Sequence, residues 1–90
     1  MSRFLFTYSG NVQGVGFRWK VMDISKSFNV TGYVQNLNSG EVEMLLEGKK
    51  NDVIRMAKEI ERSLKVFFTS VKKEEKLGEP HFDSFFIKPY

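Results

Sequence analysis

The chain of 90 residues contains no cysteine, one histidine and two prolines. Without cysteine it has no disulfide bond, no thiolate nucleophile and no thiolate metal site. Long apolar runs are also absent, and the sequence MSRFLFTYSG at the start lacks the apolar stretch of a secretory signal. We therefore expect a cytoplasmic protein with no membrane partner, no metal ion and no other cofactor.

Charge of one sign is not concentrated in any segment, although the formal net charge is +3. Lysine and arginine are interspersed with glutamate and aspartate through the second half, so the preference for anionic partners is mild. Hydrophobic residues make up 41% of the chain and aromatic residues 14%, which is enough to bury a core. At this length we expect one domain over residues 1–90, and a monomer.

Two spacings of apolar residues predict the secondary structure. Phe4, Phe6 and Tyr8 alternate with other side chains over residues 3–9, as in a strand. Apolar residues recur at helical spacing from Phe17 onward. The same criteria predict helices at about 17–28 and from a cap at Asn51 to Leu64, and strands at 31–37, 41–47, 69–77 and 84–87.

The resulting order is βαββαββ, with a hairpin turn at residues 38–40. It predicts an α+β fold, a ferredoxin-like βαββαβ sandwich with an added C-terminal strand and two helices on one face of a mostly antiparallel sheet. The first two strands would run parallel, so their ends near Ser9 and Asn36 should lie at one edge of the sheet. The glycine-rich loop between the first strand and the first helix should lie at the same edge.

That loop, GNVQGVGFR at residues 10–18, has two interpretations. Its amide groups and the N-terminus of the following helix can surround a phosphate, with the planar guanidinium of Arg18 holding two oxygens. Alternatively, the loop only turns the chain, and Arg18 is solvated or paired with a carboxylate. The loop is not a Walker A sequence, because it lacks Gly-Lys-Ser/Thr, and its glycine spacing does not match a dinucleotide-binding fingerprint, so nucleoside triphosphates are not expected.

GNVQGVGFR together with GYVQNLNSGEVE, residues 32–43, resembles the paired signature of the acylphosphatases. The resemblance implies a hydrolase that cleaves the carboxyl–phosphate bond of acyl phosphates without a metal. Arg18 then corresponds to the arginine that binds the substrate phosphate, and Asn36 to the asparagine that positions the attacking water. The loop amides around the phosphate are those of Gly14, Val15, Gly16 and Phe17.

Three positions depart from the usual family pattern. Ser39–Gly40 replaces an Asp-Gly turn, SLKVFFTSV at residues 63–71 replaces a Gly-Pro turn, and Asn11 stands where a basic residue is common. The first change concerns hairpin stability, and the other two concern the charge of the loop and the surroundings of the acyl group.

The small set of catalytic groups is consistent with this substrate class. An acyl phosphate releases a carboxylate, whose conjugate acid has a pKa of about 4, so no proton donor is needed. The remaining work is to neutralise the phosphate and to place a water in line. Inorganic phosphate or sulfate should compete for the same loop.

Several residues also have simpler interpretations. Asn36 can also be explained as an ordinary hairpin residue. His81 can be explained as a surface residue without a role. Phe67 and Phe68 are expected to pack in the core or at an edge. Glutamates 41, 43 and 47 alternate along one strand, where they predict a solvated face.

The main rival function is RNA binding, because RNA-recognition domains share the βαββαβ order and carry aromatic residues on the sheet. The third strand lacks their sequence pattern, and its glutamates would repel RNA, so no nucleic acid partner is expected. A noncatalytic anion-sensing domain is the other alternative.

Overall fold

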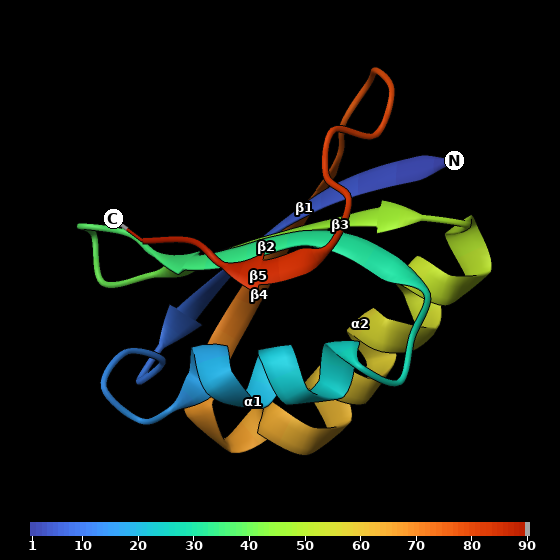
Figure 1. Cartoon of the computed structure of the whole chain (residues 1–90). Helices are drawn as coiled ribbons and strands as arrows, with labels where there is room; N and C mark the ends of the chain where they lie inside the picture. The colour runs from blue at the N-terminus through green and yellow to red at the C-terminus, as the bar shows by residue number, and fades with distance from the viewer. Residues whose placement is uncertain (90) are drawn as a thin grey trace.

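Five strands form one sheet, and both helices cover the same face of it (Figure 1). The computed structural model describes residues 1–89. The elements in chain order are β1 (Ser2–Gly10), α1 (Phe17–Ser25), β2 (Val30–Asn36), β3 (Val42–Gly48), α2 (Lys50–Leu64), the 3-10 turn η1 (Lys65–Phe67), β4 (Phe68–Glu75) and β5 (Phe85–Ile87). This is the predicted ferredoxin-like arrangement with one added strand.

The strands lie in the order β4-β1-β3-β2-β5. All neighbours are antiparallel except β2 and β5, which are parallel. Because β1 and β2 both pair antiparallel with β3, they run in the same direction, and Tyr8 and Asn36 both lie opposite Val42. The prediction that both strands end at the same edge of the sheet is therefore confirmed.

The core lies between the sheet and the helices, where the predicted alternation holds. On β3, the side chains of Val42, Met44 and Leu46 are all 0% exposed and face the helix layer. Phe17 and Val21 from α1 and Ile60 from α2 complete this layer, each at most 1% exposed. Burial of large apolar side chains on this scale is the main contribution to the stability of the fold.

Both helices differ from their predicted limits. α1 ends at Ser25 and not at residue 28, because residues 26–28 form tight turns, of which the last joins the Phe28 N–H to the Ser25 carbonyl at 3.1 Å. α2 begins at Lys50, with extended Lys49 as its N-cap and no side-chain cap. The predicted Asn51 cap is wrong, because β3 runs directly into the helix and Asn51 already lies in the first turn.

The strand β4 begins and ends earlier than the predicted range of 69–77, and β5 is limited to residues 85–87. Within residues 1–89, neither helix combines the length and the apolar character needed to cross a bilayer.

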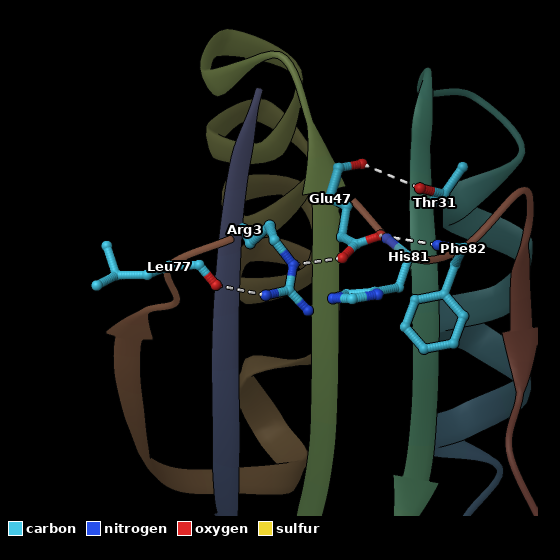
Figure 2. Close-up of polar contacts among 6 residues, drawn as sticks. All are labelled: Arg3, Thr31, Glu47, Leu77, His81 and Phe82. Carbon is cyan, nitrogen blue, oxygen red and sulfur yellow. Dashed lines mark hydrogen bonds and ion pairs between the residues drawn. The ribbon is translucent and has the colours of Figure 1, made fainter. Parts of the chain in front are cut away.

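Glu47 is buried, which contradicts its predicted place on a solvated face. Its side chain accepts a hydrogen bond from Arg3 and two from the backbone N–H groups of His81 and Phe82, at 2.8 and 3.1 Å (Figure 2). Arg3 also donates to the carbonyl oxygen of Leu77 at 2.8 Å. The connection between β4 and β5 therefore folds over this end of β3 and removes the carboxylate from water.

Candidate active site

The glycine loop joins the end of β1 to the start of α1. Gly14 and Gly16 have φ angles of 77° and 80°, in the left-handed region that other residues rarely adopt. Gly16 is also the N-cap of α1. These two conformations turn the chain from the end of β1 into the first turn of α1.

The N-terminus of α1 is uncapped. Among the described residues, no side chain caps it, and its first turn contains no acidic residue. Within residues 1–89, no carbonyl or side chain accepts a hydrogen bond from the N–H groups of residues 14–19, and the first bond of the helix runs from Lys20 to Gly16 at 3.0 Å. Unused donors at the positive end of a helix form a binding site for an anion.

Arg18 lies in this first turn and is partly buried. Among the described residues it forms no ion pair and no side-chain hydrogen bond, so the alternative of pairing with a carboxylate is not observed. A cation near the positive end of a helix is unfavourable by itself. A bound anion between the guanidinium and the helix would make the electrostatic interaction favourable, because both positive groups would then face a negative charge.

Asn36 is the last residue of β2 and is only 8% exposed. The alternation along β2 places it with Val34 on the face covered by the helices, while Gln35 belongs to the opposite face. The turn itself is closed after it, by the Leu37 N–H bonded to the Glu41 carbonyl at 2.8 Å. Asn36 is therefore a strand residue on the face of the sheet that the helices cover, and not part of an exposed hairpin turn.

Gln13 connects the glycine loop to this hairpin. Its Nε2 donates to the carbonyl oxygens of Leu37 at 2.8 Å and of Glu41 at 2.9 Å. The loop is thereby held beside the residue that follows Asn36. Nothing in the local sequence predicts these bonds, because they link positions 24 and 28 residues apart.

The Glu41 carboxylate is held away from the loop. Ser9 and Ser39 each donate a hydroxyl hydrogen bond to it, at 2.9 Å. By strand alternation, Ser9 and Glu41 belong to the face opposite to that of Tyr8 and Val42. The negative charge therefore lies across the sheet from the helix layer, where it repels an anion in the loop less. Ser39 also supports the turn in which it replaces the usual aspartate.

Aromatic packing supports the start of α1. The ring of Tyr8 lies 5.3 Å from that of Phe17 and 5.1 Å from that of Phe68. Burial and, to a lesser degree, the Glu61 carboxylate raise the pKa of Tyr8, so its hydroxyl stays protonated. Phe67 and Phe68 are half-buried against the core, as expected.

No group of three His, Asp or Glu side chains with the geometry of a metal site occurs in residues 1–89. Metal independence stays a prediction.

The fold and the loop define a ferredoxin-like α+β domain in which a glycine loop leads into an uncapped helix. The family model described as acylphosphatase matches residues 4–87. An acylphosphatase of Geotalea uraniireducens is 39% identical over 88 residues, 94% of each chain. One of Methanospirillum hungatei is 51% identical over 49 residues, which is 54% of each chain. The chain therefore belongs to the acylphosphatase family.

Solved structures agree with this assignment. The crystal structure of acylphosphatase from Bacillus subtilis superimposes with a TM-score of 0.88 at 27% identity, over 98% of this chain and 99% of that one. Full-length HypF, in a phosphate- and nucleotide-bound crystal structure, matches with a TM-score of 0.86 at 27% identity, but over only 12% of its length. Family and fold together support acyl-phosphate hydrolysis.

Proposed function

We propose that this chain hydrolyses acyl phosphates to a carboxylate and inorganic phosphate without a metal ion. In this proposal Arg18 and the backbone N–H groups of Gly14, Val15, Gly16 and Phe17 bind the phosphate. Asn36 positions the attacking water. The observation that carries the proposal is the uncapped N-terminus of α1, whose unused donors lie next to an arginine with no anionic partner in residues 1–89.

The proposed reaction is a single in-line displacement. The water oxygen forms a bond to phosphorus, and the bond from phosphorus to the acyl oxygen breaks. The carboxylate leaves with the electron pair of that bond, and a proton of the water passes to a phosphate oxygen. The carboxylate is a weak base, so the step needs no general acid.

Electrostatic stabilisation is the main contribution expected from the protein. Charge spreads over the phosphoryl oxygens in the transition state, and in this proposal the amide donors and the guanidinium stabilise that charge. The Asn36 amide has a donor and an acceptor with which to orient a water, although it is too weak a base to deprotonate it. Catalysis therefore depends on the relative positions of the loop and Asn36.

Turnover of an aryl acyl phosphate tests the proposal. We expect release of inorganic phosphate at a rate proportional to enzyme concentration, with inorganic phosphate as a competitive inhibitor. Phosphate binding without turnover would instead support the anion-sensing alternative. Salt-dependent binding of single-stranded RNA, without turnover, would support the RNA-binding alternative.

A further inference from the structure

The Gln13 side chain forms two hydrogen bonds that have no role in the reaction proposed above. Its Nε2 donates to the carbonyl oxygens of Leu37 and Glu41, at 2.8 and 2.9 Å. Because both partners are acceptors, the amide must present its NH2 group to them, and both N–H donors are used. The side chain is half-buried, so these bonds are partly shielded from competing water.

The two carbonyl groups also hold the hairpin together. The Leu37 N–H donates to the Glu41 carbonyl at 2.8 Å, and the Gly40 N–H donates to the Leu37 carbonyl at 3.1 Å. A carbonyl oxygen has two lone pairs, so Gln13 adds a bond to each without displacing the hairpin bond. Gln13 thus contacts the hairpin where its two strands come together.

Both ends of this link lie next to groups with proposed roles. Gln13 directly precedes Gly14, the first of the proposed phosphate-binding residues, and Leu37 directly follows Asn36. The two left-handed glycines of the loop have no side chains with which to anchor it. Val12, which is 1% exposed, anchors the start of the loop in the core, and the Gln13 amide supplies the side-chain hydrogen bonds that join the loop to the hairpin next to Asn36.

We propose that Gln13 is a positioning residue that holds the phosphate loop in register with Asn36, so that phosphorus and the attacking water are in line. This proposal rests on the proposed function. A displacement of about 1 Å in such an arrangement can lower the rate about 100-fold. Gln13 would act on the catalytic step without contacting the reacting atoms.

The first test compares two methionine substitutions. Gln13→Met keeps the length of the side chain and removes both donors. Gln35→Met is the matched control, because Gln35 is also half-buried and loses a 2.8 Å bond to Glu43, on the opposite face of the sheet. We expect Gln13→Met to lower kcat at least about tenfold and to change the phosphate inhibition constant less than about threefold, with Gln35→Met near wild type in both.

A double-mutant cycle separates positioning from general stabilisation. If Gln13 acts through Asn36, Gln13→Met should change kcat less than about threefold once Asn36 is alanine. Equal losses in both backgrounds would overturn the positioning role, as would equal effects of Gln13→Met and Gln35→Met. Absence of wild-type turnover would overturn the proposed function itself, and the positioning role with it. Full turnover by Asn36→Ala would leave the activity standing but would refute the role of Asn36 and therefore the positioning role.

A glutamate at position 13 gives an independent readout if Gln13→Met does not fold. The ionised carboxylate faces two carbonyl oxygens and cannot donate, whereas the protonated form can donate one hydrogen bond. The kcat of Gln13→Glu, as a fraction of wild type at the same pH, should therefore rise as the pH falls toward about 4. A fraction that stays constant with pH would contradict the positioning role.

Discussion

Arg3 and Glu47 lie directly opposite each other on β1 and β3, and their side chains form an ion pair of 2.5 Å (Figure 2). The Glu47 side chain is 0% exposed and that of Arg3 only 13%. Through Leu77 on one side and His81 and Phe82 on the other, this pair holds both ends of the connection between β4 and β5. It lies far from the glycine loop along β1, so we expect it to affect stability and not catalysis.

Glu47→Gln should lower the free energy of unfolding by about 2 to 3 kcal/mol at pH 7, because it leaves the Arg3 charge poorly paired. Burial raises the pKa of Glu47, but the hydrogen bonds from Arg3, His81 and Phe82 outweigh it and hold that pKa below the ordinary value of 4.5. The ionised carboxylate therefore stabilises the fold above the unfolded pKa, and this contribution is lost as the pH falls through the folded pKa.

Urea unfolding at several pH values measures this effect. The difference between wild type and Glu47→Gln should shrink in acid, and a difference that does not vary with pH would contradict the linkage. Glu59→Gln is the control, because Glu59 forms an exposed i,i+3 pair with Arg62 and should change stability little.

Arg18→Gln and Asn36→Ala should have different effects on turnover and on phosphate binding. Loss of the guanidinium removes charge-assisted bonds to the phosphate, each worth about 1.5 to 3 kcal/mol, so both turnover and phosphate binding should be lost. Asn36→Ala removes the proposed contact to the water, so kcat should fall about 100-fold or more while phosphate affinity stays near wild type. Phosphate-dependent rises in melting temperature report the affinity. Normal turnover by Asn36→Ala would refute the division of roles.

Gly14→Ala and Gly40→Ala should cost similar stability but differ in phosphate binding. Both glycines have positive φ, 77° and 95°, and a Cβ at either would meet nothing within 4 Å. The left-handed conformation costs an alanine about 1 to 2 kcal/mol in each case. Of these two glycines, only Gly14 lies in the loop proposed to bind phosphate. Only its substitution should therefore reduce the rise in melting temperature that phosphate causes. An equal rise in melting temperature with phosphate in the two variants would argue against phosphate binding by the glycine loop.

Excess chelator should leave acyl-phosphate turnover unchanged, because the proposed reaction uses no metal ion.

Simple alkyl phosphates should react poorly. The alkoxide that an alkyl phosphate releases is a strong base and needs an acid that the proposed site does not supply. Sulfate should inhibit in the same way as phosphate. Activity that EDTA abolishes and a divalent ion restores, or comparable rates on alkyl and acyl phosphates, would refute this account.

Much of the fold was predictable because its signals are local. The alternation in β1 and β3 and the helical spacing after the loop identified the layers, and Val42, Met44 and Leu46 are buried as predicted. The order of the elements was then enough to bring the ends of β1 and β2 to one edge. The positions of Arg18 and Asn36 relative to these elements followed from chain order alone.

Other features depended on contacts between distant segments. Glu47 shares the alternation of Glu43, yet it is buried, because residues 77–82 fold over it and supply two of its hydrogen bonds, in addition to the one from Arg3. The bonds of Gln13 likewise cross from the loop to the hairpin. The sequence by itself determined the periodic pattern of the elements, because this pattern depends on neighbours in the chain, and it named the candidate site residues through their resemblance to the acylphosphatase motifs. Only the tertiary structure decided which polar groups are buried and joined, because their partners are brought near by folding.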